Sequence, residues 1–170
     1  MHTFLLLGAV FAMTIFSSSA SALSLHSPTI NNNDTIPVIH TCDDKDISPA
    51  LSWTDIPEKT ETLALILADP DAPSGTFFHW VLFNIPKKVT TFPEGVTQLP
   101  PGTKVGKNSF GKQQYNGPCP PKGLPHHYIF SLYALDSPLA LPDGADAKKV
   151  LQALQGHVIS EVRLMALYGR

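Results

Sequence analysis

The segment E-T-L-A-L-I-L-A at residues 61–68, the turn D-P-D-A-P-S-G at residues 69–75 and the segment F-F-H-W-V-L-F-N-I at residues 77–85 decide the fold. The first segment is an almost unbroken apolar run, which is typical of a β-strand that is covered on both faces. The prolines and the glycine of the turn end this strand. The second segment, which Pro86 closes, predicts the returning strand of an antiparallel hairpin.

The rest of the chain reads mainly as further strands separated by turns. These strands are predicted at residues 48–53, 127–135 and 159–168. Only residues 146–155 (D-A-K-K-V-L-Q-A-L-Q) have a helical pattern, with Val150, Leu151 and Leu154 on one side and Gly156 where a helix commonly ends. The pattern predicts an all-β dominated fold, a β-sandwich with a late helix.

The composition excludes several classes of protein. The chain has 170 residues, of which 16 are Pro and 15% are charged, and its formal net charge is −2. This length suits one ordinary domain with a real core. Frequent proline argues against a helical bundle, and the high apolar content argues against a disordered chain. The charge balance gives no sign of nucleic-acid binding.

Residues 1–22 are predicted to be a signal peptide. Residues 4–16 form an apolar run too short to span a bilayer, and Ala20 and Ala22 supply the small residues that signal peptidase prefers. No Lys or Arg precedes Lys45, which leaves an uncleaved anchor or a buried N-terminal helix as the alternative. We expect cleavage before Leu23, one domain over residues 23–170, and an exported protein, periplasmic or secreted, that is not transmembrane after cleavage.

The two cysteines, Cys42 and Cys119, allow one disulfide bond if the protein is exported to an oxidising compartment. The bond would close a loop of 77 residues. Such a bond typically stabilises a protein by about 2–4 kcal/mol. The alternative is two buried thiols. No C-x-x-C spacing is present to indicate a zinc site.

Residues 100–125 follow neither a helical nor a strand pattern. Six of these residues are Pro and five are Gly. Loops of this length in compact domains are usually functional or disordered. Phe110, Tyr115 and the run G-P-C-P-P at residues 117–121 favour an ordered, packed loop over a floppy insertion.

Polar side chains lie at the ends of the predicted hairpin strands. Asp69 and Asp71 follow the first strand, and His79 opens the second. Because the two ends lie side by side in an antiparallel hairpin, these side chains can share one small volume. Strict alternation gives His79 the face of positions 81, 83 and 85, opposite to Trp80 and Leu82.

A third strand begins with His126 and Tyr128 on one face and His127 on the other. If the sheet brings this strand beside the hairpin, two His, two Asp and one Tyr line a pocket walled by prolines and aromatic rings. A few polar groups in an apolar hollow are typical of a ligand site. Taken singly, each residue has an ordinary structural explanation: an Asx-turn, a hydrogen-bonded strand histidine or a packed tyrosine.

These motifs together resemble the phosphatidylethanolamine-binding protein (PEBP) family, most closely its bacterial Raf-kinase-inhibitor-like branch. They are D-P-D-A-P at residues 69–73, H-W at 79–80, G-P-x-P-P-x-G at 117–123, H-x-Y at 126–128, S-P-x-L-S-W at 48–53, G-H at 156–157 and Y-G-R at 168–170. Cys42 also fits that branch. The resemblance covers nearly all of residues 23–170. It implies a Greek-key β-sandwich of two antiparallel sheets, with one or two short helices near the C-terminus and an anion pocket at one end.

The resemblance also implies which residues bind the ligand. They are Asp69, Asp71, His79, Gly117, Pro118, His126 and Tyr128. His127 departs from the family motif, which usually carries Arg there. No catalytic residue, metal ligand or cofactor is implied. The expected partner is a phosphate-bearing small molecule or a lipid headgroup, and the family name leaves room for a protein partner or a homodimer.

Two carboxylates beside an anion make chemical sense if they orient His79 and His126 and raise the pKa of both imidazoles. Tyr128 and backbone N–H groups near Gly117 would add donors. Binding should then weaken as the pH rises through about 7. Two alternatives use the same side chains: a hydrolase, although Ser74 lacks the G-x-S-x-G motif, and a metal site.

Overall fold

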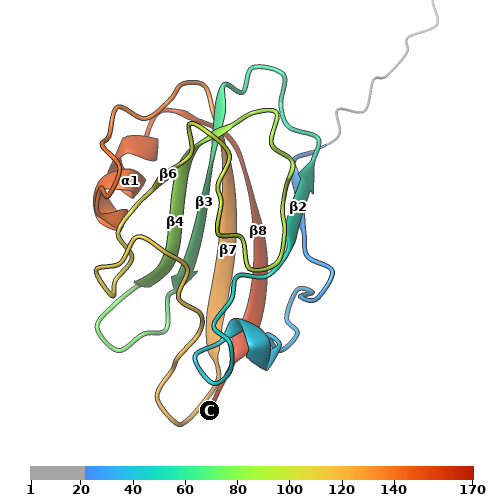
Figure 1. Ribbon diagram of the computed structural model, residues 1–170, viewed down its shortest axis with the longest axis vertical. Helices are drawn as coiled ribbons and strands as arrows, with labels where there is room; N and C mark the ends of the chain where they lie inside the picture. Colours follow the sequence, from blue (N-terminus) through green and yellow to red (C-terminus); the bar gives the residue numbers. More distant parts are fainter. Residues whose placement is uncertain (1–21) are drawn as a thin grey trace, which may run out of the picture.

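A computed structural model of the protein describes residues 22–170, so the predicted signal segment, apart from Ala22, lies outside the described residues. Two antiparallel sheets make up the structure (Figure 1). The smaller sheet has the order β1-β2-β5, with β1 at Ser24–His26, β2 at Leu51–Thr54 and β5 at Thr91–Phe92. The larger has the order β6-β4-β3-β7-β8, with β6 at Lys104–Val105, β4 at Phe77–Pro86, β3 at Thr62–Asp69, β7 at His126–Leu135 and β8 at Val158–Tyr168. The predicted fold class is confirmed.

β3 lies in the middle of the larger sheet and is buried on both faces, as its apolar sequence predicts. On one face, Leu65 and Leu67 join a core between the two sheets that includes Trp53 and Phe92 of the smaller sheet. On the other face, Ala64 and Ile66 belong to a second core that Val150 and Leu154 of the helix help to form. Burial of each large apolar side chain contributes about 1.5–3 kcal/mol, so the continuous apolar run fixes β3 between the layers.

The helix α1 (Ala147–Leu154) covers the outer face of the larger sheet, as Figure 1 shows. It lies within the predicted range and is one residue shorter at each end. Val150 and Leu154 are buried, and Gly156 has a φ of +83°, which suits the reversal of the chain into β8. Within residues 22–170, no helix has the length and apolar character needed to cross a membrane.

β4 does not follow the strict alternation that its sequence predicts. Leu67 pairs with Trp80, whereas Ala68 pairs with Phe78, so His79 is an extra residue in a β-bulge. A second irregularity lies between Leu82 and Ile85, where Asn84 has a φ of +54°. Each bulge shifts the alternation by one residue.

The two bulges overturn the predicted grouping of His79 with positions 81, 83 and 85. Val81 and Phe83 belong to the core beneath α1, whereas Ile85 joins Trp80 in the core between the sheets. The ring of His79 instead contacts neighbouring aromatic rings at the end of the sheet. The bulge therefore turns the histidine away from the helix layer.

Several short elements were not predicted from the sequence. They are β1, β5, β6 and the 3-10 helix η1 at Val38–His40. β2 begins at Leu51 rather than at residue 48, and the predicted strand at residues 127–135 begins at His126. The disulfide between Cys42 and Cys119 is present, with a Cα–Cα distance of 5.4 Å. It ties the segment after η1 to the proline-rich loop.

Candidate functional site

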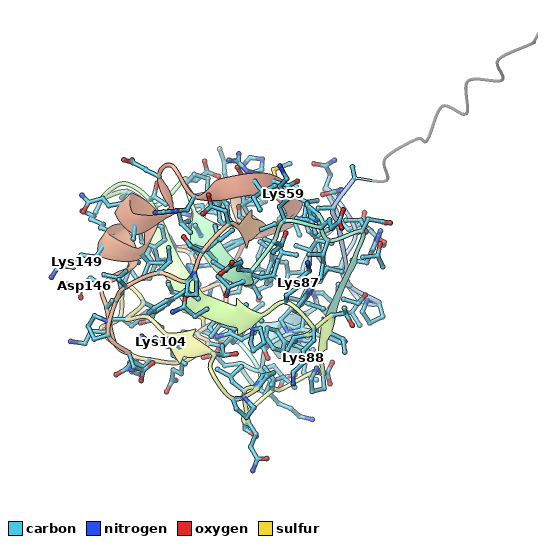
Figure 2. The ribbon with its side chains drawn as sticks, turned by 90° about the horizontal axis from the view of Figure 1, so that it is seen from above. Lys59, Lys87, Lys88, Lys104, Asp146 and Lys149 are labelled. Carbon is cyan, nitrogen blue, oxygen red and sulfur yellow. A yellow bond between two sulfur atoms is a disulfide. The ribbon has the colours of Figure 1, made fainter. Side chains whose placement is uncertain are left out.

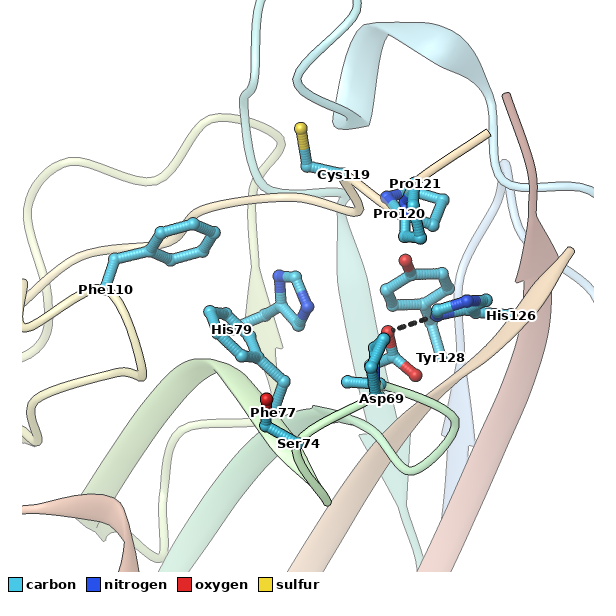
Figure 3. A pocket seen from close by; sticks show the side chains of 12 residues that line it. Asp69, Ser74, Phe77, His79, Phe110, Cys119, Pro120, Pro121, His126 and Tyr128 are labelled. Carbon is cyan, nitrogen blue, oxygen red and sulfur yellow. Dashed lines mark hydrogen bonds and ion pairs between the residues drawn. The ribbon is translucent and has the colours of Figure 1, made fainter. Parts of the chain in front are cut away.

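A cavity of about 330 Å³ lies at the end of the larger sheet where β3 stops and β4 and β7 begin (Figure 3). Its lining comprises Asp69, Ala72, Pro73, Ser74, Phe77, His79, Phe110, Cys119, Pro120, Pro121, His126 and Tyr128. The hairpin and β7 thus bring four predicted site residues together: Asp69, His79, His126 and Tyr128. Aromatic rings and prolines form most of the remaining wall, which is the usual construction of a small-molecule site.

The imidazole of His79 is held in one orientation. Its Nδ1 lies 2.9 Å from the carbonyl oxygen of Asn116 and 3.1 Å from that of Gly117. The ring is buried and packs at 5.3 Å, centroid to centroid, against Tyr128. Burial lowers the pKa of His79, and the opposing effects of the two carbonyls and the Asp69 carboxylate do not reverse this shift. The upward shift expected from the sequence is therefore wrong for His79.

Asp69 and His126 form a pair across the cavity floor. The Asp69 Oδ2 lies 2.8 Å from Nδ1 of His126, and the Asp69 Oδ1 accepts the backbone N–H of Asp71 at 2.8 Å. Asp69 is only 3% exposed. A buried carboxylate that is paired in this way fixes the neighbouring imidazole, as the sequence predicts.

The hydroxyl of Tyr128 is buried and has no hydrogen-bond partner of good geometry within residues 22–170. Figure 3 shows this hydroxyl pointing towards Pro120 and Pro121 at the cavity wall. Burial and the negative charge of Asp69 both raise the pKa of Tyr128, so the hydroxyl keeps its proton. The Asp69 carboxylate and the Cys119 backbone interact with this hydroxyl, but neither forms a hydrogen bond of good geometry, so Tyr128 can still donate to a group in the cavity.

Asp71 lies outside the cavity lining, although the sequence placed it in the pocket. Its carboxylate accepts the backbone N–H of His127 at 2.8 Å and lies 2.6 Å from Nδ1 of the same residue. Both side chains are more than one-third exposed. The hydrogen bonds from His127 lower the pKa of Asp71. The structure thus gives Asp71 a role in tying the loop after β3 to the start of β7.

Gly117 and Pro118 also lie behind the cavity wall rather than in it. A Cβ at Gly117 would stand 2.0 Å from the carbonyl oxygen of His40, so only glycine fits there. The backbone N–H of Gly117 donates to Asp46, and the carbonyl of Pro118 accepts the N–H of Cys42 at 3.1 Å. These two residues position the loop that presents Cys119 and the following prolines.

Sequence reasoning missed the residues that hold the long loop against β4. Asn108 is buried, and its Nδ2 donates to Asn116 Oδ1 at 2.9 Å and to the backbone oxygens of Gln114 and His79. Its Oδ1 accepts two backbone N–H groups of its own loop. The Tyr115 hydroxyl donates to the carbonyl of His40 at 2.6 Å. The aromatic residues and the G-P-C-P-P run had indicated an ordered loop, which is confirmed, but nothing in the sequence singled out Asn108.

The lining of the cavity lacks a permanently charged cation. It contains neither Lys nor Arg. Lys59, Lys87 and Lys88 lie on connections at the opposite ends of β3 and β4, and Figure 2 views the molecule from that side. Hydrogen bonds from neutral or paired groups must therefore provide most of the recognition in the cavity.

The geometry gives little support to the two alternative chemistries. In the described part of the chain, no group of three or more His, Cys, Asp and Glu side chains is arranged to hold a metal ion. Ser74 lines the cavity, but among residues 22–170 no histidine accepts a hydrogen bond from its hydroxyl. A serine nucleophile needs such a base to become reactive.

The fold and the cavity define a β-sandwich binding protein with a small pocket at one end of its larger sheet. The chain belongs to the phosphatidylethanolamine-binding protein family, because the sequence profile of that family matches residues 26–169. The suspected resemblance is confirmed. Membership of this family supports a binding function.

Similar proteins come from several organisms. A UPF0098 protein of Methanothermobacter thermautotrophicus is 46% identical over 151 residues, covering 87% of this chain and 99% of that protein. The crystal structure of E. coli YbcL, described as a member of the mammalian PEBP family, has a TM-score of 0.84 at 31% identity and covers 88% of this chain and 99% of that chain. A PEBP homologue from Chlamydia trachomatis has a TM-score of 0.81 at 34% identity, with 88% and 98% covered.

Proposed function

We propose that this protein is a non-catalytic binding protein whose cavity takes a phosphate-bearing small molecule or lipid headgroup. One observation carries the proposal. Three buried polar side chains, Asp69, His79 and Tyr128, reach the same apolar cavity from three adjacent strands. Of the three, the buried Tyr128 hydroxyl lacks a hydrogen bond of good geometry; such a group costs about 1–3 kcal/mol, and a polar ligand would remove this cost.

The proposed donors for the ligand are the Tyr128 hydroxyl and the outer nitrogen of His126. The Asp69 carboxylate holds Nδ1 of His126, so Nε2 is the ring nitrogen left for the ligand. Phe77 and Phe110 would exclude water from the bound group. Modest affinity is expected because no Lys or Arg takes part.

Replacing Tyr128 by Phe tests this proposal. The variant should bind phosphate and phosphoethanolamine about fivefold to tenfold more weakly, since one hydrogen bond contributes about 1–1.5 kcal/mol. The ligand-free variant should unfold at the same or a higher denaturant concentration, because the unpartnered buried hydroxyl is gone. Titration calorimetry and denaturant unfolding measure the two effects.

Tyr133→Phe is the matched control, because Tyr133 lies on the same strand and packs against the core beneath α1. It should leave affinity unchanged. Equal loss of affinity in both variants, or no binding of either ligand to the unaltered protein, contradicts the proposal.

Export to the periplasm or the medium is part of the same proposal. The disulfide between Cys42 and Cys119 supports it, since such bonds persist mainly in oxidising compartments. Modulation of a protein partner and formation of a homodimer stay predictions of the family resemblance.

A further inference from the structure

The first half of β8 leaves one edge of the larger sheet open. β8 is the outermost strand of this sheet, and Figure 1 shows it beyond β7. Among residues 22–170, no segment pairs with the outer side of β8 before Met165. The open part, V-I-S-E-V-R at residues 158–163, contains neither Pro nor Lys, which commonly protect such edges, and its Val158 and Ile159 are 42% and 38% exposed. A strand of another chain can therefore pair with this edge.

The hydrogen bonds at the far end of β8 show which of its backbone groups point outward. Met165 and Leu167 direct backbone groups to the outer side, where they bond to the segment at residues 33–36. The register of β8 with β7 is regular from residue 160 onward, so outward groups recur at every second residue. The free outward groups of the open edge therefore belong to Glu161 and Arg163.

Glu161 and Arg163 also place opposite charges on one face of the strand. Nε of Arg163 lies 2.5 Å from Oε1 of Glu161, and the Arg163 side chain is 61% exposed. In an antiparallel pair, residues that lie directly opposite share a face, and their side chains interact. The charges of this edge thus decide which register a second strand can take.

Only one antiparallel register of two copies of β8 satisfies both the hydrogen bonds and the charges. Outward backbone groups must meet outward groups, so Glu161 lies opposite Glu161, Arg163 opposite Arg163, or Glu161 opposite Arg163 of the second copy. The first two registers bring like charges together, which destabilises a strand pair. The third forms two Glu–Arg pairs about a twofold axis at Val162, and each pair exchanges two backbone hydrogen bonds.

We propose that β8 binds β8 of a second copy of this chain, antiparallel and centred on Val162, so that the two larger sheets become one continuous sheet. The same surface of both copies then forms the interface, as a twofold dimer requires. This pairing is independent of the ligand cavity, which includes His126 and so lies at the other end of β8, beside Tyr168. Because the open edge is short, we expect a dimer of modest affinity.

Charge reversal tests the pairing, with sedimentation velocity of the disulfide-bonded protein from about 1 μM to about 1 mM as the measurement. The unaltered protein should change from monomer to dimer over this range. Glu161→Arg and Arg163→Glu each place like charges opposite one another, so each variant should dimerise at least about tenfold more weakly. If the unaltered protein stays monomeric throughout, the proposal is wrong, and the charges protect the edge from pairing.

An equal mixture of the two variants separates this pairing from general effects of charge. The two Arg side chains of one variant then face the two Glu side chains of the other, so the mixture should dimerise as tightly as the unaltered protein. Glu161→Arg combined with Arg163→Glu should do the same, which excludes misfolding as the cause of the single losses. Lys149→Glu, exposed on α1, is the control and should leave dimerisation unchanged. A mixture that stays monomeric contradicts the proposal.

Amide hydrogen exchange provides an independent readout of the interface. The N–H groups of Glu161 and Arg163 should exchange at least about tenfold more slowly at the highest protein concentration than at the lowest, because they become bonded in the dimer. The N–H of Val162 points towards β7 and should exchange at the same rate throughout. A dimer that leaves Glu161 and Arg163 exchanging rapidly uses another surface, and the proposal is then wrong.

Discussion

The two loops that wall the cavity are held in place in different ways. The wall at residues 106–121 is fixed by the disulfide of Cys119, by the buried amide of Asn108 and by the close fit of Gly117. The wall at residues 70–76 is tied by Asp71, whose backbone N–H donates to the buried Asp69 carboxylate and whose exposed carboxylate accepts from His127. The first is held by several buried groups, whereas the second depends on one residue, Asp71, whose carboxylate is exposed.

This difference indicates separate roles for the long wall (residues 106–121) and the short wall (residues 70–76). The carbonyl groups of Asn116 and Gly117 in the long wall bind Nδ1 of His79, and this determines which ring nitrogen faces the cavity. The short wall contributes Ala72, Pro73 and Ser74 to the lining and makes few buried hydrogen bonds. Segments held by exposed bonds open at low free-energy cost, so ligand entry is expected on the side of the short wall.

Removal of the disulfide, which holds the long wall, should lower the stability of the protein more than any other change proposed here. Cys42→Ser combined with Cys119→Ser frees a loop of 77 residues, for which the loss in unfolding free energy is about 4 kcal/mol. Denaturant unfolding measures this loss, and phosphate titration should show weaker binding because Cys119 lines the cavity. A loss below about 1 kcal/mol would mean that the buried hydrogen bonds alone hold the long wall.

Gly117→Ala should have the next largest effect. The added methyl group meets the carbonyl of His40, and overpacking of this kind costs about 1–3 kcal/mol of stability. It should also displace the carbonyl groups that orient His79 and so weaken phosphate binding. Gly111→Ala is the control in the same wall: its Cβ meets nothing within 4 Å, and its φ of +75° costs about 1–2 kcal/mol. If Gly111→Ala weakens phosphate binding as much as Gly117→Ala does, the close fit of Gly117 is not what positions these carbonyl groups.

The sequence predicted best the strands and the helix that have continuous or periodic apolar patterns. The runs at residues 61–68 and 127–135 became β3 and β7, and Gly156 correctly marked the end of α1. The strands β5 and β6 were missed because two residues are too few to show a periodic pattern. Their positions depend on the strands that they pair with.

The sequence predicted the site residues at the right strand ends but not all of their contacts. Alternation failed at His79 because bulges depend on backbone pairing, which the order of side chains does not reveal. It also gave Asp71 a place in the pocket, whereas the backbone N–H of His127 binds that carboxylate. The lowered pKa of His79 depends on burial by residues far away in the chain, such as Phe110 and Tyr128.

The smallest effect is expected at the short wall. Asp71→Asn should lower stability at pH 7 by less than about 1 kcal/mol, since the pair with His127 is exposed to solvent. Hydrogen bonds from His127 lower the pKa of Asp71, so the folded protein holds this proton less tightly than the unfolded chain. The contribution is therefore complete above about pH 4 and disappears as the pH falls through the lowered value. Thermal unfolding at pH 7 and pH 3 measures it.

Asp136→Asn is the matched control, because Asp136 pairs with His157 in a similarly exposed contact away from the cavity. Both variants should bind phosphate within twofold of the unaltered protein. A tenfold loss of phosphate affinity in Asp71→Asn alone would instead support the role in ligand binding that the sequence predicted for Asp71. The short wall would then be part of the binding site. The contact of Asp71 with His127, which positions this wall, would then affect ligand affinity as strongly as the disulfide-bonded wall does.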